Sequence, residues 1–278
     1  MSVEPQGAEA PPTLELTSEP AGVRTWARSV WGHRSVLRTL AAKDFKVRYK
    51  RASFGVAWAV ALPLVQALVL AVVFSRLGLD TEGIDYLGYV LAGVTAWSFA
   101  SVSFTSGTTA VVDGAALTDK IWFPRALLVL APIGANLVGL AIGLGIVTVV
   151  QLGRGQLGVD VVLVVPAVLV LVALATGLSL VTSALYVGFR DVRFVVQAAT
   201  LLLFYVTPIL YTPERLGGLA DLLPLNPFAG AVGLFQQAFA GATVGGAELA
   251  GTLIWTVVLL VAGVVLHQRG DRTFVDLL

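Results

Sequence analysis

The spacing of charged residues constrains this chain most strongly, because most of its length runs in long intervals without a single charge. Five intervals of 20 to 29 residues lie between Arg51 and Arg76, Asp85 and Asp113, Arg125 and Arg154, Asp160 and Arg190, and Arg193 and Glu214, and a sixth of 18 residues runs from Leu249 to Leu266. A charge costs several kcal/mol at the centre of a bilayer, and a helix needs about 20 apolar residues to cross its hydrocarbon core. The intervals therefore predict an all-α integral membrane protein with six transmembrane helices.

The composition agrees with lipid as the main solvent. Hydrophobic residues make up 57% of the chain and charged residues 13%, which is about half the charged fraction of a typical soluble domain. The chain has no cysteine, and its two histidines, His33 and His267, stand near opposite ends. We therefore expect no disulfide, no metal site and no catalytic thiol.

One further uncharged segment, residues 222–247, contains no helical stretch long enough to span a membrane. It includes Asn226-Pro227, Gln236-Gln237 and several glycines. Its best helical stretch, about Pro227 to Phe239, would be about 20 Å long, against about 30 Å of hydrocarbon core. We predict that residues 214–247 form a re-entrant hairpin on the outer side, between the fifth and sixth spans.

The distribution of lysine and arginine predicts the orientation. With six spans both termini share one side, and that side receives 15 of the 18 Lys and Arg residues. Because cytoplasmic loops carry an excess of these residues, both termini are expected in the cytoplasm. In this reading residues 52–268 form the transmembrane domain, and residues 269–278 form a cytoplasmic C-terminus.

The segment before the first span divides into two parts. Residues 1–23 hold four glutamates, four prolines and no basic residue, a composition typical of a disordered acidic cytoplasmic tail. Residues 24–51 are predicted to form a basic amphipathic helix at the inner membrane interface, with apolar positions such as Leu37 and Leu40 on one side. The basic residues that we assign to contact with anionic membrane lipids are Lys43, Lys46, Arg48, Lys50 and Arg51.

This basic segment has two other interpretations. It can serve only as a positively charged signal that fixes topology, which remains an open alternative. Nucleic acid binding is not expected, because the segment is tied to a membrane span. An ammonium group beside an anionic headgroup contributes about 1 kcal/mol, so nine basic residues favour a surface-lying helix.

Hydroxyl residues recur along one face of the second predicted span. Hydroxyl groups and flat ring faces suit a sugar chain, whereas small hydroxyl residues also allow helices to pack closely in lipid. The sequence leaves both interpretations open. The candidate channel-lining residues are Trp97, Ser98, Ser101, Phe104, Thr105 and Thr108.

The sequence lacks the patterns of several enzyme classes. No lysine follows a glycine, so the chain has no Walker-type phosphate loop and no ATPase site of its own. The only acidic cluster, Asp80, Glu82 and Asp85, falls on the first outer loop, where solvation explains it. We expect no catalytic residue, and we keep a membrane-embedded enzyme of cell-envelope glycan synthesis as a remote alternative.

Four short motifs stand out along the chain. They are residues 44–51 with Phe54-Gly55-Val56-Ala57-Trp58 and Pro63; Lys120-Ile121-Trp122-Phe123-Pro124-Arg125; Phe189-Arg190-Asp191-Val192; and Thr207-Pro208-Ile209-Leu210-Tyr211 with Leu225-Asn226-Pro227-Phe228. In their order and on their predicted sides of the membrane, they resemble motifs of the permease subunits of ATP-binding cassette (ABC) polysaccharide exporters of the O-antigen, teichoic acid and capsule type. The resemblance covers about Ser35 to Leu266.

The resemblance implies a homodimer in the bacterial cytoplasmic (inner) membrane that forms a continuous channel for a lipid-linked polysaccharide. Two separate ABC ATPase subunits would bind ATP and Mg on the cytoplasmic face, so no cofactor is expected in this chain. The residues to which the resemblance gives a coupling or gating role are Lys120, Trp122, Phe123, Pro124, Arg125, Arg190 and Asp191. For the charged members of that set, ordinary positive-inside residues and a helix cap at Asp191 remain alternatives.

Two further readings of function stay open. Within the same fold, the cargo could be a small lipophilic drug or lipid, and outside it the chain could be a membrane scaffold without transport activity. Richness in Ala, Val, Gly and Leu with only four lysines is typical of a high-GC genome, which adds cell-wall galactan to the candidate cargoes.

Overall fold

The computed structural model describes residues 22–50, 55–76, 83–118 and 123–277, and these ranges contain helices and no strand. The predicted tail therefore lies almost wholly outside the described residues. The helices are α1 (Val23–Gly32), α2 (Arg34–Tyr49), η1 (Gly55–Ala57), α3 (Trp58–Arg76), α4 (Tyr86–Asp113), α5 (Ala115–Thr118), α6 (Ala126–Gly153), η2 (Val159–Leu163), α7 (Val164–Gly188), α8 (Val192–Val206), η3 (Pro213–Leu225), α9 (Ala229–Ala240) and α10 (Gly246–Leu277).

Four helical segments in the described part of the chain are long and apolar enough to cross a membrane. They are α4, α6, residues 159–188 (η2 with α7) and the Gly246–Gly270 part of α10, and they match the second, third, fourth and sixth predicted spans. The first and fifth predicted spans form shorter apolar helices, Ala61–Val73 within α3 and the whole of α8. The all-α membrane fold is confirmed, while the count of six spans stays a prediction.

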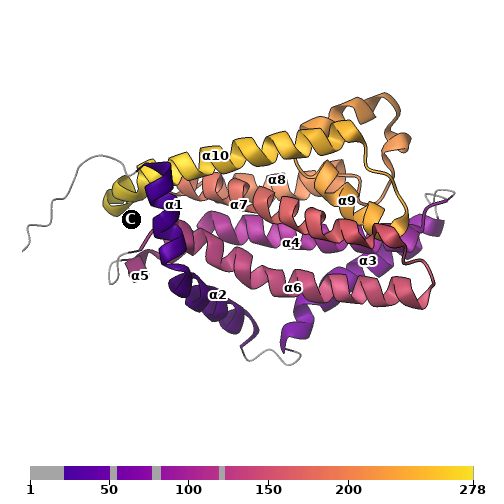
Figure 1. Cartoon of the computed structure of the whole chain (residues 1–278), viewed down its shortest axis with the longest axis horizontal. Coiled ribbons are helices and arrows are strands. Elements are labelled where there is room, and N and C mark those ends of the chain that lie inside the picture. The colour runs from indigo at the N-terminus through magenta and orange to yellow at the C-terminus, as the bar shows by residue number, and fades with distance from the viewer. Residues whose placement is uncertain (1–21, 51–54, 77–82, 119–122, 278) are drawn as a thin grey trace, which may run out of the picture.

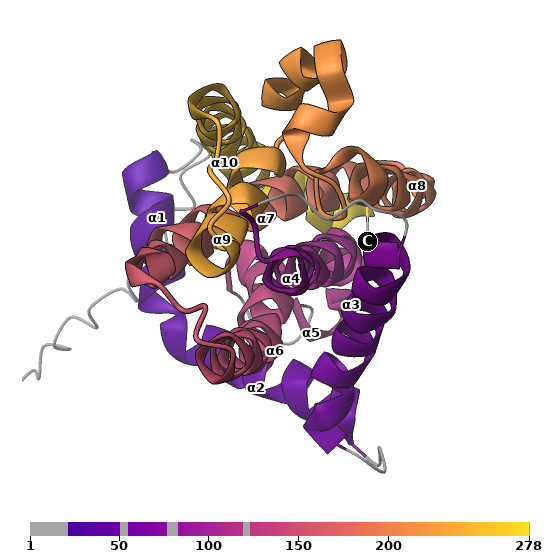
Figure 2. The same ribbon diagram turned by 90° about the vertical axis from the view of Figure 1, so that its right-hand side faces the viewer.

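Helix α4 forms the centre of the bundle, with α3, α6, α7, α8 and α9 arranged around it (Figures 1 and 2). Its apolar window is 78% buried, against 17% for the corresponding window of α10. Helix α10 packs along α7 instead, and glycines allow this approach. A Cβ at Gly177 would stand 2.7 Å from the Leu260 nitrogen, and one at Gly263 would stand 2.6 Å from the Leu180 Cβ, so any larger side chain would force the two helices apart.

The two ends of the bundle differ in what they contain. At one end, here called the α2 end, α1, α2 and α5 lie near the C-terminal part of α10 (Figure 1). At the other, the α9 end, lie η3, α9 and the C-terminal part of α6 (Figure 1). Helix α1 also contacts α10 directly. The first and last described helices therefore share one end, as an even number of crossings requires.

The predicted basic interface helix consists of two helices that meet at His33. His33 leaves helical geometry (φ −93°, ψ 22°) next to Gly32, and its Nδ1 lies 2.8 Å from the Ser29 carbonyl oxygen. Glycine disfavours a helix interior, which explains the break. The apolar side of α2 packs against α6, where Leu40 joins a buried cluster with Leu127, so this helix is attached to the bundle as well as being suited to a lipid surface.

The segment between α8 and α10 packs its helix α9 into one end of the bundle. Its helix α9 begins two residues after the predicted start at Pro227, ends at Ala240 and is buried along most of its length. Gly241 ends it in the left-handed region (φ 71°), which glycine adopts without strain. Helix α9 packs against α4, η2, α7 and α10. Its depth in a bilayer remains a prediction.

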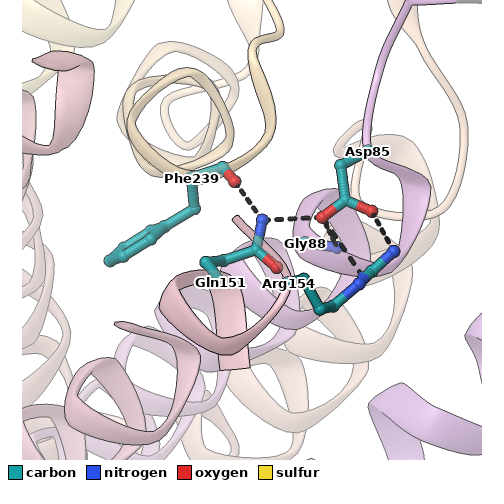
Figure 3. Close-up of polar contacts among 5 residues, drawn as sticks. All are labelled: Asp85, Gly88, Gln151, Arg154 and Phe239. Atoms are coloured by element: carbon teal, nitrogen blue, oxygen red, sulfur yellow. Dashed lines mark hydrogen bonds and ion pairs between the residues drawn. The ribbon is translucent and has the colours of Figure 1, made fainter. Parts of the chain in front are cut away.

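A cluster of polar contacts around Asp85 joins three helices at the α9 end (Figure 3). Asp85 caps α4 by accepting from the Gly88 N–H at 3.3 Å, and its carboxylate forms an ion pair with Arg154 at 3.1 Å. The Gln151 amide donates to the same carboxylate at 2.6 Å and to the Phe239 carbonyl at 2.5 Å. The interpretation of Asp85 as a solvated loop residue was therefore wrong, since its side chain is only 8% exposed.

Pro208 ends α8, and α4 supplies donors for the carbonyl groups that this break leaves without helical partners. The Tyr89 hydroxyl lies 2.9 Å from both the Pro208 and the Tyr211 carbonyl oxygens, and Tyr86 donates to the Leu210 carbonyl at 2.7 Å. Gln236 of α9 adds a second donor to Pro208 O at 2.8 Å. Because buried carbonyl groups need partners, these contacts hold the motif at 207–211 in one conformation.

Candidate substrate groove

Two cavities run along the face of α4 that α8 leaves free, and they meet at Arg48. The first, of about 530 Å³, lies between α3, α4 and α6. The second, of about 680 Å³, lies between α2, α4, α5 and α6. Arg48 lines both cavities, and we refer to the two together as the α4 groove.

Hydroxyl residues of α4 line both parts of the groove. Ser98 and Ser101 face the first cavity, and Ser106 and Thr109 face the second. Ser101 donates to the Ser98 carbonyl at 3.2 Å and Ser106 to the Val102 carbonyl at 2.6 Å. Since each hydroxyl oxygen keeps acceptor capacity after donating its proton, the groove offers a row of acceptors along the bundle.

Arg48 is held at the junction of the two cavities by an amide from α6. Its Nη1 donates to Asn136 Oδ1, and Asn136 Nδ2 donates to the Ser103 hydroxyl at 3.1 Å. Asn136 and Ser103 are buried, whereas Arg48 itself is exposed. A guanidinium group carries five N–H donors in a planar fork, and the bond to Asn136 orients this fork while using only one of them.

The walls of the groove change character from one cavity to the other. The first cavity is mostly apolar, with Trp58, Leu62 and Leu140 among its lining residues. The second contains the charged side chains of Lys43, Asp44 and Asp113. Burial raises the pKa of the Asp44 carboxyl above its ordinary value, against the opposing effect of Lys43 and Arg48. The arrangement suits an amphiphilic molecule whose anionic group binds at Arg48.

The candidate channel-lining residues of α4 separate into two groups. Ser98 and Ser101 line the groove, and Thr105, half-buried, donates to the Ser101 carbonyl at 2.8 Å. Thr108 is fully buried, with its hydroxyl 2.8 Å from that of Thr182 on α7. The predicted stripe thus faces the groove at one end of its length and the α4–α7 contact at the other.

The two candidate aromatic residues lie inside the bundle. Trp97 is 7% exposed and Phe104 is 5% exposed. The Trp97 ring stands 5.3 Å from that of Phe228 and 6.0 Å from that of Phe204, centroid to centroid. In this single chain both rings contribute to helix packing.

The candidate coupling residues lie at the α2 end in two places. Phe123, Pro124 and Arg125 are buried just before α6, and Phe123 joins the cluster under α2. Lys120, Trp122 and, from the interface set, Arg51 lie outside the described residues. Asp191 is exposed and precedes α8 without making a side-chain capping bond, so the capping alternative is not seen.

The remaining basic candidates lie on exposed surfaces. Arg190 is exposed between α7 and α8, with its guanidinium carbon 5.5 Å from the centre of the Tyr186 ring. Lys43, Lys46 and Lys50 are exposed on α2 and line an open hollow of about 920 Å³. Of the predicted interface residues in the described ranges, Arg48 and Lys43 contribute to the α4 groove.

Sequence reasoning missed Asn136, Ser106 and Thr109. Asn136 stands within a long apolar interval, and a polar amide at that depth is unfavourable unless it finds a partner. This signal was available in the sequence. The partner, Arg48, is 88 residues away, so no local pattern could have identified it.

Comparison with known proteins gives one family and several named relatives. The ABC-2 type transporter family matches residues 35–240. An O-antigen export system permease protein RfbA of Myxococcus xanthus is 26% identical over 216 residues, covering 76% of this chain and 83% of the relative. A protein of the same name from Klebsiella pneumoniae is 24% identical over 249 residues, covering 87% and 95%. A second from that organism is 23% identical over 254 residues with the same coverage.

Proposed function

Because this chain belongs to the ABC-2 type transporter family, we propose that it is the membrane permease of an exporter that carries a lipid-linked polysaccharide out of a bacterial cell. The named relatives, which are O-antigen export permeases, support this cargo class. Family members are transport permeases that work with an ABC ATPase. ATP and Mg would bind to that partner subunit, since this chain has no phosphate loop.

The observation that carries the proposal is the position of Arg48 between a mostly apolar cavity and one that contains charged side chains, with hydroxyl groups of α4 along both. A lipid-linked polysaccharide combines a hydrocarbon chain, a phosphate-containing link and a sugar chain. Arginine binds phosphate oxygens with two parallel N–H bonds, hydroxyl side chains pair with sugar hydroxyls, and the apolar cavity suits the hydrocarbon. The α4 groove offers these three kinds of contact in that order.

In this proposal the α2 end faces the cytoplasm and the α9 end faces the outside. The helices α3, α4, α6, α7, α8 and α10 make six crossings, and η3 with α9 forms the re-entrant hairpin. The distribution of Lys and Arg supports this orientation. Only three of the 18, Arg76, Arg154 and Arg215, fall in the loops predicted at the α9 end, and cytoplasmic loops carry an excess of these residues.

A second copy of the chain would complete the channel. Helix α8 buries only Val196 and leaves Leu201, Leu202 and Tyr205 more than half exposed. Its 15 residues reach about 22 Å, less than the hydrocarbon core. Helix α3 likewise exposes Leu62 and Val65. Two such edges, paired around an axis beside α3 and α8, support a homodimer with the α4 groove near its centre.

The ATPase would dock at the α2 end. The surface there combines α1, the basic face of α2 and the exposed pair Arg190 and Asp191, and the turn at Phe123–Arg125 is buried behind it. The turn lies directly under α2, since Phe123 and Leu40 share one cluster. A movement of α2 caused by nucleotide binding would therefore reach Arg48 through the same helix.

The alternative cargo is a small lipophilic drug or lipid, which the apolar walls of the first cavity favour. The two cargoes make different demands on Arg48. An anionic lipid-linked polysaccharide needs its guanidinium, whereas a neutral lipophilic molecule does not.

Deletion of the chromosomal copy tests the proposal. The deletion strain should accumulate a lipid-linked glycan inside the cell and lack that glycan on its surface, and the wild-type chain should restore export. Arg48→Ala should restore it poorly, and Arg48→Lys partly. Arg269→Ala removes an exposed charge from α10, outside the groove and the proposed docking surface, and should restore export fully. Normal surface glycan in the deletion strain, with no internal accumulation, would overturn the proposal.

A further inference from the structure

A further cavity, of about 260 Å³, lies at the α9 end and is separate from the α4 groove. It is enclosed by the start of η3, by α9 and by the loop that leads into α10. Residues 241–244 of that loop line it, and Gly241 gives the loop its left-handed turn (φ 71°). The cavity is therefore built by the segment that sequence analysis identified only as a hairpin.

Thr212 lines this cavity and carries an unsatisfied polar atom. The residue is 1% exposed, and its Oγ1 finds no hydrogen-bond partner within the described part of the chain. Since buried hydroxyl groups are nearly always paired, a rotation of this side chain towards the cavity would give its hydroxyl a partner in a bound molecule.

Two carboxylates line the same cavity. Glu214 is exposed at the start of η3, and Glu248 is half-buried in the first turn of α10, where its Oε2 accepts from the Gly245 N–H at 3.4 Å. No lysine or arginine stands among the described residues that line the cavity. The cavity therefore accepts hydrogen bonds and repels anions.

Tyr89 and Gln236 line the cavity but use their donors within the protein. The Tyr89 hydroxyl lies within hydrogen-bond distance of the Pro208 and Tyr211 carbonyls, to which it can only donate. The Gln236 amide nitrogen donates to the Pro208 carbonyl. A ligand that carries hydroxyl donors therefore suits the carboxylates that line the cavity.

The volume of the cavity decides between a metal ion and an organic ligand. A single ion or water takes up about 30 Å³, far less than this space, and the described residues hold no group of three or more His, Cys, Asp or Glu that could bind a metal. A sugar unit brings several hydroxyl donors, carries no obligatory charge and has flat apolar faces. We propose that this cavity binds one sugar unit of the exported glycan at the α9 end, through Thr212, Glu214 and Glu248.

This inference rests on the proposed function, because the α9 end is where the glycan would leave the bundle. A weak site there holds the sugar chain on the outer side between transport steps and opposes its return. Its ligand is the sugar chain itself, so the lipid carrier should not affect binding.

The test is saturation-transfer NMR on the chain, purified with its ATPase subunit in nanodiscs, using short oligosaccharides cut from the host's own lipid-linked glycan. Glu214→Gln and Glu248→Gln should each weaken binding about tenfold. Thr212→Val replaces the unsatisfied hydroxyl with a methyl group. It should weaken binding about threefold and leave the thermal unfolding temperature unchanged. Asp221→Asn removes a carboxylate from the same segment outside the cavity, and should bind as the wild type does.

Two results would overturn the inference. One is equal oligosaccharide binding by the wild type and all four variants. The other is binding of CaCl₂ in calorimetry that Glu214→Gln and Glu248→Gln abolish, together with no saccharide signal from the wild type. In either case, accumulation of lipid-linked glycan in the deletion strain leaves the proposed function standing, and its absence removes both.

Discussion

Asp85 at the α9 end and Arg48 beside the α4 groove are charged residues that each bond to an amide side chain of α6, Gln151 and Asn136 respectively, yet their surroundings differ. Asp85 is fully engaged, by the Arg154 ion pair, the Gln151 amide and the Gly88 N–H, and is nearly inaccessible. Arg48 is bonded to Asn136 and otherwise borders two cavities. One charge is neutralised where helices must stay together, and the other is oriented where a ligand can reach it.

The difference shows that polar residues have two roles in this mostly apolar chain: some stabilise the packing of helices, and others face a cavity. At the α9 end, Tyr86, Tyr89 and Gln236 give donors to carbonyl groups that a helix break exposes, so the contacts stabilise one arrangement. In the groove, hydroxyl groups bond within their own helix and leave acceptors facing space. We therefore expect substitutions of these donor residues at the α9 end to affect stability, and substitutions in the groove to affect transport.

The largest loss in the free energy of unfolding is expected for Asp85→Ala. The change removes a helix cap and an ion-pair partner and leaves the Gln151 amide without its carboxylate, which together should lower the free energy of unfolding by about 3 kcal/mol. Titration of the purified chain with SDS, followed by circular dichroism, measures this. Asp191→Ala is the matched control, because Asp191 precedes α8 without a capping bond, and a change above about 0.5 kcal/mol there would undermine the comparison.

A smaller loss is expected for Tyr89→Phe. The variant keeps the buried ring but removes the Tyr89 donor from the Tyr211 carbonyl, while Gln236 still donates to the Pro208 carbonyl, at a cost of about 1–2 kcal/mol. The same SDS titration applies. Tyr205→Phe, whose ring is 62% exposed, should match the wild type. Equal stability of the two variants would mean that the hydroxyl of Tyr89 does not hold the 207–211 segment.

Groove residues should change accessibility with little change in stability. Cysteines introduced as Ser101→Cys and Ser106→Cys should react with a hydrophilic thiol reagent, and each should alter the free energy of unfolding by less than about 0.5 kcal/mol. Thr108→Cys should stay unreactive, because that position is fully buried against Thr182. Labelling of the purified transporter, with and without nucleotide, provides the measurement. Reaction at Thr108→Cys alone would place the path on the opposite side of α4.

The smallest expected effect is the contribution of Asp44 to the pH dependence of the free energy of unfolding. Burial raises the pKa of its carboxyl above 3.8 in the folded chain, so ionisation is less favourable in the folded state than in the unfolded state. The folded state therefore loses relative stability as pH rises from 3.8 through the raised value. An asparagine side chain cannot ionise, so the Asp44→Asn variant does not undergo this loss. Its free energy of unfolding should therefore rise relative to that of the wild type over this pH range, by less than about 0.5 kcal/mol because the group is partly solvated. A difference that does not vary with pH would contradict this account.

The arrangement of long helices could be predicted from the sequence because the constraint is local. A charge every 20 to 30 residues marks the ends of apolar helices, and Asp85, Asp113, Arg125 and Arg154 do flank α4 and α6 closely. The family prediction from short motifs is confirmed by the match over residues 35–240. The α9 helix was placed within two residues by the same length argument.

The site was harder to predict because it depends on contacts between distant segments. Arg48 was grouped with the lysines of α2 by charge alone, and its bond to Asn136 follows only from the packing of α2 on α6. Trp97 stands beside Ser98 in the sequence, but the Phe204 and Phe228 rings pack against it from other helices. Helical spacing identifies which residues share a face, whereas it does not identify what covers that face.

The most direct test of the central claim is photocrosslinking in cells that synthesise the glycan. A photoreactive amino acid at Ser106, inside the α4 groove, should crosslink to the lipid-linked glycan, and Arg48→Ala should reduce the product at least fivefold. The same amino acid at Val165, which is 64% exposed on α7, should give none. Equal crosslinking at both positions, or no product at Ser106 while export continues, would contradict the assignment of the α4 groove as the path of the substrate.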